Sequence, residues 1–361
     1  MSKFWSDFVA GLTPYVPGEQ PPEGLFIKLN SNESPYEPSP KAIAAMQAAV
    51  AQGLALYPDS EATAVRQAVA KYYGLSDDQV FVANGSDESL AHTFQGLFRR
   101  GNKKILFPSI TYSFYPVYAK LFQVPFEQVP LAADYSIDLA PYLAAKPEEV
   151  SAIIFANPNA PTSMQLELAQ IEQLLQAQPD ILIVVDEAYV DFGGTSAVGL
   201  IAKYTNLLVI QTVSKSRSLA GIRVGFALGQ AELLQALIRV KNSFNSYPVD
   251  RIAQAGAIAA FEDEEHFNQT RQKIITSREY LEREVRALGF EVLPSKTNFI
   301  FMRHPELDAA AIAAALRERL ILVRHFKQDP IMQFLRVTIG TQENCEILVK
   351  NLSEILSKGM I

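Results

Sequence analysis

The sequence predicts an α/β fold with a mainly parallel sheet, of the seven-stranded type, flanked by helices. Short apolar runs without polar alternation are typical of strands buried on both faces. Such runs lie at Lys104–Phe107, Ala152–Ala156, Ile181–Val185 and Leu207–Gln211. Helical patterns such as Leu166–Gln178 lie between them. Strands that alternate with helices indicate a largely parallel sheet covered on both faces.

The first part of the chain precedes this alternation. Gly11–Pro40 is rich in Pro, Asn, Ser and Glu, which predicts an extended arm with turns. Helical spacing of apolar residues then predicts helices at Lys41–Gln52 and Glu61–Tyr73, and Gly74 is a typical stop for the second helix.

The organisation changes after Pro248. Val249–Leu288 predicts a long helical stretch that breaks near Glu262–Glu264. It is followed by short strands and helices at Phe290–Leu293, Asn298–Met302, Asp308–Arg319, Phe334–Ile339 and from Glu343 onward. This pattern indicates a smaller α+β domain. We expect an arm over 1–30 that packs on the small domain, a large domain over 31–247 and a small domain over 248–361.

Composition excludes several classes of protein. The 361 residues are 48% hydrophobic and 20% charged, as in an ordinary globular enzyme, and the net charge of −7 is spread along the chain, which argues against a nucleic-acid partner. No stretch has the length of a membrane span, and the N-terminus lacks a signal-peptide pattern. The single cysteine, Cys345, fits a reducing compartment. We expect a soluble, cytoplasmic protein.

Two further patterns carry no predicted role. The four histidines have no metal-ligand spacing, so we expect no metal site; they are His92, His266, His304 and His325. The acidic run Phe261–Glu265 is typical of a solvated helix end.

Polar segments follow the predicted strands, where ligands bind to parallel sheets. Asn84–Glu88 follows an apolar run and opens a helix, so Ser86 and Asp87 either cap that helix or bind a phosphate. Asp186 ends a buried strand, where a carboxylate needs a partner. A pyridinium nitrogen, a turn or a metal ion each meets that need.

Two cationic residues follow the next strand. Lys215 comes directly after Thr212 and Ser214, and it is either a Schiff-base amine or a solvated side chain. Arg223 lies in the small-residue segment Ala220–Gly225, which permits a tight chain reversal. Its guanidinium suits a bidentate phosphate contact or an ordinary ion pair. The order and joint placement of these segments favour a single site.

These segments resemble the fold-type I pyridoxal-5′-phosphate (PLP) enzymes of the aspartate aminotransferase superfamily, and within it the histidinol-phosphate aminotransferase family. The resemblance covers nearly the whole chain. Its matching motifs are Pro14–Gly18, Asn30–Pro35, Tyr57–Asp59, Asn84–Glu88, Asn157–Thr162, Asp186–Tyr189, Ser214–Gly225, Thr297–Phe299 and Leu335–Gly340.

The resemblance implies a role for each site residue. Lys215 would bind PLP covalently and then move a proton on the substrate. Asp186 would keep the ring nitrogen protonated, and Tyr189 would hydrogen-bond the phenolic oxygen O3′. Tyr112 would stack on the ring, unless it is plain core packing. The phosphate would be bound by Ser86, Asp87, Thr212, Ser214 and Arg223. In a homodimer, Tyr57 of the neighbouring subunit would reach the same phosphate. Otherwise Tyr57 is a turn residue beside Pro58.

One motif departs from the family pattern. An asparagine that shares O3′ with the tyrosine usually precedes a proline, and this chain has Ala160 there, with Ser163 in place of a glycine. We expect Asn157, Asn159 or a water molecule to supply the missing contact. The two asparagines are otherwise turn residues between prolines.

Substrate recognition is expected to depend on arginines. Arg336 lies in the strand pattern Phe334–Ile339, and the resemblance assigns it the α-carboxylate of the amino-acid substrate, which its planar fork suits. Arg324 is the expected second arginine or a surface residue, and Tyr15 would add a hydroxyl. Other residues expected near the substrate, or else in core or turn positions, are Asn32, Asn298 and Tyr247.

The implied reaction is amino transfer between L-histidinol phosphate (giving imidazole acetol phosphate) and 2-oxoglutarate/glutamate, in histidine biosynthesis. The partners would be small-molecule amino and keto acids. Alternatives on the same scaffold are an aromatic amino-acid aminotransferase and a decarboxylase of the threonine-phosphate type. A PLP-binding regulator would carry a basic helix-turn-helix, which does not precede this unit. A nucleotide-binding protein without PLP would leave Lys215, Asp186, Tyr189 and Arg223 without a common purpose.

Overall fold

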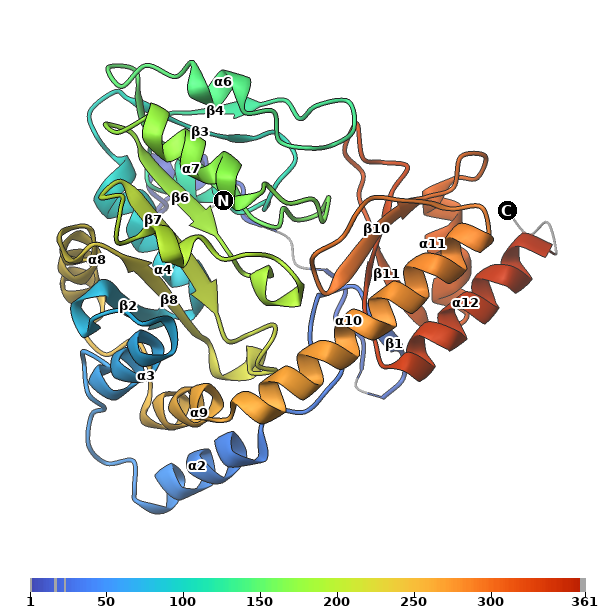
Figure 1. Cartoon of the computed structure of the whole chain (residues 1–361), viewed down its shortest axis with the longest axis horizontal. Helices are drawn as coiled ribbons and strands as arrows, with labels where there is room; N and C mark the ends of the chain where they lie inside the picture. Colours follow the sequence, from blue (N-terminus) through green and yellow to red (C-terminus); the bar gives the residue numbers. More distant parts are fainter. Residues whose placement is uncertain (1, 16–17, 23, 358–361) are drawn as a thin grey trace.

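The computed structural model describes residues 2–15, 18–22 and 24–357, and it contains two sheets (Figure 1). Val16 and Pro17, within the Pro14–Gly18 motif, lie outside the described residues. One sheet has seven strands and helices on both faces, and the other has five strands. Helix α10 (Glu264–Ala287) runs from the first sheet toward the second. The predicted fold class is therefore confirmed.

The seven-stranded sheet has the order β2-β8-β7-β6-β5-β3-β4. Only β8 runs antiparallel to its neighbours. The strands are β2 (Val80–Asn84), β3 (Lys104–Pro108), β4 (Phe126–Val129), β5 (Val150–Ala156), β6 (Leu182–Asp186), β7 (Leu207–Thr212) and β8 (Val224–Gly229). The strands predicted from the four apolar runs are confirmed as β3, β5, β6 and β7.

Both faces of this sheet are buried, because successive side chains enter different cores. In β2, Val80 and Val82 face one core, whereas Phe81 and Ala83 face the other. The first core is closed by α2 (Pro40–Ala51), α3 (Thr63–Tyr73), α7 (Leu168–Ala177) and α9 (Arg251–Glu262), and the second by α4 (Gly85–Thr93), α5 (Tyr115–Leu121) and α8 (Ala231–Phe244). Because helices cover both faces of the sheet, we expect polar site residues at the carboxyl ends of its parallel strands.

The five-stranded sheet has the order β1-β11-β12-β10-β9. Its strands are β1 (Ile27–Leu29), β9 (Glu291–Val292), β10 (Phe299–Arg303), β11 (Ile321–His325) and β12 (Leu335–Thr338). Helices α10, α11 (Ala309–Glu318) and α12 (Gln342–Ser357) pack on one face. The arm joins this sheet through β1, which pairs in parallel with β11. Nearer the N-terminus, Tyr15 instead packs against Phe114, in the loop before α5 of the other sheet, with ring centroids 4.4 Å apart.

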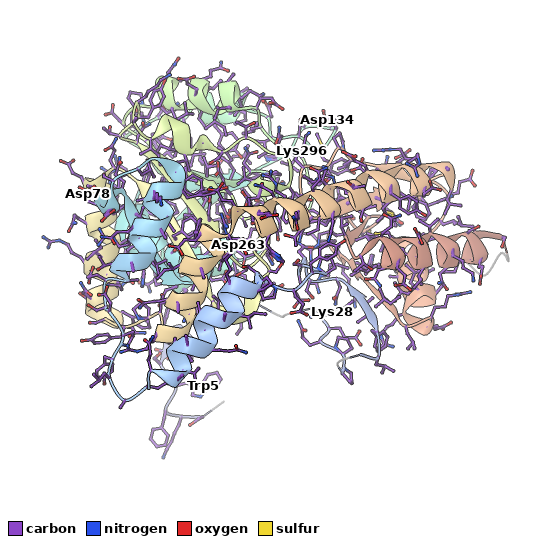
Figure 2. The ribbon with its side chains drawn as sticks, turned by 60° about the horizontal axis from the view of Figure 1, so that its bottom comes forward. Trp5, Lys28, Asp78, Asp134, Asp263 and Lys296 are labelled. Carbon is purple, nitrogen blue, oxygen red and sulfur yellow. The ribbon has the colours of Figure 1, made fainter. Side chains whose placement is uncertain are left out.

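The long helical stretch breaks at Asp263, as the sequence predicts. Asp263 accepts a hydrogen bond from Ser39 and pairs with Lys41 at 3.0 Å where α9 meets α10 (Figure 2). Asp263 is also buried, whereas the acidic run was expected to be a solvated helix end. Ala253 and Phe261 of α9 belong to the core of the large sheet. We therefore propose the domain boundary at Asp263 instead of at 247/248.

The remaining α-helices of the described residues are short: α1 (Asp7–Ala10) in the arm and α6 (Ala140–Leu143) beside the large sheet. Within residues 2–15, 18–22 and 24–357, no helix combines the length and apolar character needed to cross a bilayer. The same part of the chain contains no cluster of three or more His, Cys, Asp or Glu side chains placed to bind a metal ion.

Candidate active site

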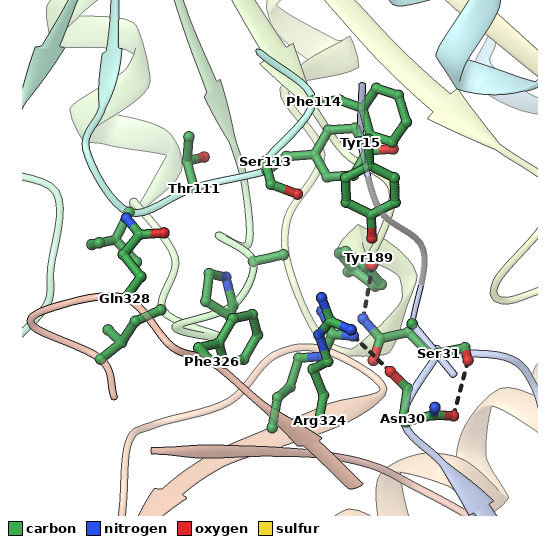
Figure 3. Close-up of a pocket in the computed structure, with 18 of the residues that line it drawn as sticks. Tyr15, Asn30, Ser31, Thr111, Ser113, Phe114, Tyr189, Arg324, Phe326 and Gln328 are labelled. Atoms are coloured by element: carbon green, nitrogen blue, oxygen red, sulfur yellow. Dashed lines mark hydrogen bonds between the residues drawn. The ribbon is translucent and has the colours of Figure 1, made fainter. Parts of the chain in front are cut away.

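Two adjoining cavities lie at the carboxyl edge of the large sheet. The inner cavity, of about 100 Å³, is lined, among the described residues, by side chains between Ser86 and Arg223 that lie around the seven-stranded sheet. The outer cavity, of about 450 Å³, is lined by the arm, by the 109–116 loop and by the small sheet (Figure 3). Four residues line both cavities: Tyr112, Ala160, Tyr189 and Lys215. The predicted lysine thus stands where the two cavities meet.

Asp186 lies in the inner cavity as the last residue of β6 and is only 4% exposed. Its carboxylate accepts hydrogen bonds from the Tyr115 hydroxyl at 2.9 Å and from the Ala188 N–H at 3.3 Å. Burial raises the pKa of Asp186 to about 6, although the Tyr115 contact opposes that shift. A buried carboxylate with only neutral donors is well placed to bind a protonated ring nitrogen. Tyr115 was missed as a site residue because its aromatic run reads as core packing.

A cradle for an anion lies in the same cavity. Ser86 and Asp87 begin α4, and Arg223 approaches them, pairing with Asp87 at 3.1 Å. A Cβ on Gly85 would lie 2.7 Å from the Arg223 guanidinium, and one on Gly225 would lie 2.1 Å from the Ser86 nitrogen. Glycine is therefore required at Gly225 by the approach of the Ser86 backbone, and at Gly85 by its left-handed backbone with φ 79°. A helix N-terminus beside a guanidinium and two hydroxyls suits a phosphate; the hydroxyls are those of Thr212 and Ser214.

Gly225 lies in β8, a strand that the sequence did not predict, and it allows this strand to pass close to α4. The Ala220–Gly225 segment was expected only to reverse the chain, but β8 begins at Val224 and passes directly over the start of α4. The small residues serve close packing of β8 against that helix start as well as the turn.

Lys215 and Tyr189 form the boundary between the cavities. The Lys215 amine lies 5.9 Å from the centre of the Tyr189 ring. Tyr112 donates a hydrogen bond to Asp87 at 2.7 Å, so its ring is fixed beside the inner cavity. The donor set fits PLP: an acid for the ring nitrogen, a cradle for the phosphate, a phenol for the ring oxygen, and an amine for the aldehyde.

Asn157 and Asn159 do not line either cavity, so the expectation that one of them meets O3′ is not supported. Asn157 exchanges two hydrogen bonds with the Leu166 backbone, at 2.7 and 3.1 Å. Asn159 donates to the Ile110 carbonyl at 2.9 Å and accepts from Thr111 at 2.8 Å. Both amides are used to fix the loop that follows β5.

Two arginines lie in the outer cavity, at paired positions of β11 and β12. Arg336 donates to the Asn30 carbonyl at 2.9 Å, and burial lowers its pKa, with the charge of Arg324 acting in the same direction. No carboxylate of the described residues forms an ion pair with either arginine. Neighbouring cations without a neutralising acid form a site for an anion.

The other predicted substrate residues fall into two groups. Tyr15 and Asn32 line the outer cavity, as expected. Asn298 is fully buried behind it and donates to the Asn32 carbonyl at 3.0 Å. Tyr247 lies outside both cavities and stacks on Tyr57, which is 78% exposed, with ring centroids 4.6 Å apart. The structure therefore does not bring Asn298, Tyr247 or Tyr57 to the cavities of this chain.

Comparisons with known proteins agree with this geometry. The model of the family Aminotransferase class I and II matches residues 26–352. Histidinol-phosphate aminotransferase 1 of Pseudomonas fluorescens (strain Pf0-1) is 57% identical, covering 98% of this chain and all of the relative. Histidinol-phosphate aminotransferase 1 of Bordetella parapertussis is 55% identical, covering 99% of this chain and all of the relative.

The solved structures show the same fold. The histidinol-phosphate aminotransferase of Sinorhizobium meliloti, solved in complex with pyridoxal-5′-phosphate, has a TM-score of 0.87 at 24% identity and covers 99% of each chain. An aspartate aminotransferase mutant of Thermus thermophilus has a TM-score of 0.83 at 19% identity, covering 98% of this chain and all of the other. The chain belongs to the class I and II aminotransferases and, within them, to the histidinol-phosphate aminotransferase family.

Proposed function

We propose that this chain transfers an amino group between L-histidinol phosphate and 2-oxoglutarate with PLP bound at Lys215, as a step of histidine biosynthesis. One observation carries the proposal beyond family membership. Lys215 stands between an inner cavity that suits the cofactor and an outer cavity with two unneutralised arginines. A group bound to this lysine is therefore within reach of an anionic substrate.

Each residue of the inner cavity has a separate role toward the cofactor or the substrate. PLP, when bound, supplies an aldehyde for the amino group and a ring that accepts electrons from the substrate Cα. Asp186 holds a proton on the ring nitrogen. Burial disfavours the charged carboxylate of Asp186, and an ion pair with the protonated ring nitrogen offsets that cost. Arg223 and the start of α4 hold the phosphate, and Tyr112 holds the ring plane. Lys215 moves a proton at the substrate Cα as general base and acid.

The outer cavity selects the substrates. Histidinol phosphate and 2-oxoglutarate share no side chain, but each presents an anionic group away from the reacting carbon. Arg336 binds the α-carboxylate of 2-oxoglutarate or glutamate, and Arg324 binds the distal group, which is a phosphate in one half-reaction and a carboxylate in the other. Aromatic rings of Tyr15, Phe114 and Phe326 line the same cavity and offer an apolar wall to an imidazole (Figure 3).

The exposed pair Tyr57 and Tyr247 supports a homodimer. Leu54 and Leu56, in the same segment as Tyr57, are also exposed in the single chain. We propose that this segment packs on a second copy in the cytoplasm and that Tyr57 reaches the partner's phosphate. Tyr247 accompanies Tyr57 there instead of contacting the substrate of its own chain.

An absorbance experiment tests the function. The purified protein with PLP is expected to show a visible-edge band that L-histidinol phosphate bleaches and 2-oxoglutarate restores. Glutamate is expected to bleach the same band, and phenylalanine to act more weakly. A band that only phenylalanine bleaches would favour an aromatic aminotransferase, and a band that no donor bleaches would contradict amino transfer.

A further inference from the structure

Asn32 has contacts that a simple substrate ligand does not need. It follows β1, is 1% exposed and has a left-handed backbone with φ 56°, a conformation that asparagine tolerates better than most residues. Its Nδ2 donates to the Tyr189 hydroxyl oxygen at 2.9 Å. Its backbone carbonyl is bound by Asn298 at 3.0 Å. The side chain is thus fixed against Tyr189 from the outer-cavity side.

Thr338 of β12 determines which end of the amide faces Tyr189. The Thr338 Oγ1 accepts the Asn32 N–H at 2.9 Å and donates its own proton to Asn32 Oδ1 at 3.0 Å. If the amide were turned over, Thr338 would face two donors and its buried hydroxyl proton would lose its acceptor. The amide oxygen therefore faces Thr338, and the amide nitrogen faces Tyr189.

This orientation fixes the direction of the Tyr189 proton. Because the phenol oxygen of Tyr189 accepts a hydrogen bond from Asn32, the phenol proton points away from Asn32. The Tyr189 hydroxyl donates to no group in the part of the chain described here. The residue lines both cavities. Ala160 on the opposite loop has no polar side chain to share the task. The phenol proton is therefore free for an acceptor bound in the inner cavity.

We propose that Asn32 is a positioning residue that acts through Tyr189, turning its phenol proton toward the phenolic oxygen of the cofactor. The proposal rests on the proposed function, which places PLP there. It also makes the contact a link between three segments, since Thr338 belongs to β12, Asn32 to the segment that follows β1, and Tyr189 to the segment that follows β6. Displacement of the small sheet would release the amide and with it the phenol.

The pH midpoint of the bound cofactor's visible band provides the test. A hydrogen bond donated to the phenolic oxygen favours the form in which that oxygen no longer shares a proton with the Lys215 nitrogen, and so lowers the midpoint. Tyr189→Phe is expected to raise it by about 0.5–1 pH unit, the size of one hydrogen bond. Asn32→Asp should raise it as much, because its carboxylate would accept the phenol proton instead of donating to the phenol.

A double variant separates positioning from charge. In the Tyr189→Phe background, Asn32→Asp should shift the midpoint by less than half of its effect in the wild-type protein. An equal shift in both backgrounds, or none in the wild-type protein, would overturn the proposal. Thr338→Val adds no charge and is expected to raise the midpoint, whereas Thr338→Ser keeps the hydroxyl and should not. Equal midpoints for these two would also count against it.

The failure of the proposed function would look different. A wild-type protein that shows no visible band with PLP would remove the function and this inference together. A wild-type band whose midpoint is raised by Tyr189→Phe but left unchanged by Asn32→Asp and by Thr338→Val would remove the role of Asn32 alone. Melting temperatures of the variants, measured without cofactor, identify any variant that is merely unfolded.

Discussion

The inner and outer cavities are built in different ways. Every described residue that lines the inner cavity lies near the end of a strand of the seven-stranded sheet. The outer cavity is assembled from the arm, a large-domain loop and the small sheet. The reacting groups are thus held by a rigid edge, whereas the groups that bind substrate depend on how the domains meet. Chemistry and recognition can therefore be changed separately, except where the Asn32–Tyr189 contact joins the two cavities.

The largest effect is expected from the inner cavity. Asp186→Asn keeps the shape of the side chain but removes the charge that holds the ring nitrogen protonated. The turnover number should fall about 10²–10³-fold, as for the loss of one preorganised electrostatic partner, while KM changes little. Stopped-flow half-reactions with L-histidinol phosphate provide the measurement. A loss confined to KM would show that the division between the cavities is wrong.

Asp186→Asn is expected to lower activity but to raise the stability of the apoprotein. Because burial raises the pKa of Asp186 to about 6, the folded apoprotein keeps a proton that the unfolded chain loses near pH 4. Its stability should therefore fall as the pH rises from about 4 to about 6, by about 3 kcal/mol. Asp186→Asn apoprotein should be the more stable protein at pH 8 and equal to wild type at pH 4. Urea unfolding at both pH values would show this crossover or its absence.

Changes in the outer cavity should act mainly on substrate binding. Arg336→Lys keeps the charge but loses the planar fork, and we expect kcat/KM for 2-oxoglutarate to fall about 10- to 100-fold through KM. Arg324→Lys is the matched variant at the paired position of the neighbouring strand. Steady-state kinetics with both substrates would reveal whether one arginine reads phosphate and the other carboxylate. An unchanged KM in both variants would contradict the role of this pair.

The smallest effect should come from Tyr115, whose hydroxyl donates a hydrogen bond to the carboxylate of Asp186. Tyr115→Phe removes one hydrogen bond, so the rate should fall only about 5-fold. Because that bond lowers the pKa of Asp186, its loss should raise the pKa further in the apoprotein. Tyr142→Phe is a suitable control, because its buried hydroxyl has no partner among the described residues and it lies away from both cavities. Equal losses in the two variants would remove any special role for Tyr115.

The sequence predicted the inner cavity better than the outer one for a physical reason. Lys215, Asp186 and Ser86 each follow a strand of a parallel sheet, and the carboxyl ends of such strands share one edge. Their neighbourhood in space therefore follows from the order of strands and helices. Tyr115 was not predicted as a site residue because its ring packs in the core and only its hydroxyl reaches Asp186.

The outer cavity depends on contacts that local patterns do not encode. Arg324 and Arg336 were predicted by resemblance, but their pairing across β11 and β12 required the register of the small sheet. Asn298 and Tyr247 lie near the right residues in the sequence and still face elsewhere. The loop amides Asn157 and Asn159 have suitable chemistry, but backbone and hydroxyl groups of the loops after β5 and β3 already bind them.

The most direct test is to determine which residue carries the cofactor. Borohydride reduction of the PLP-loaded protein, followed by proteolysis and mass spectrometry of the peptides, fixes the attachment site. We expect a single reduced adduct on Lys215 and none in the Lys215→Arg variant. An adduct on another lysine, or a wild-type protein that carries none, would contradict the account.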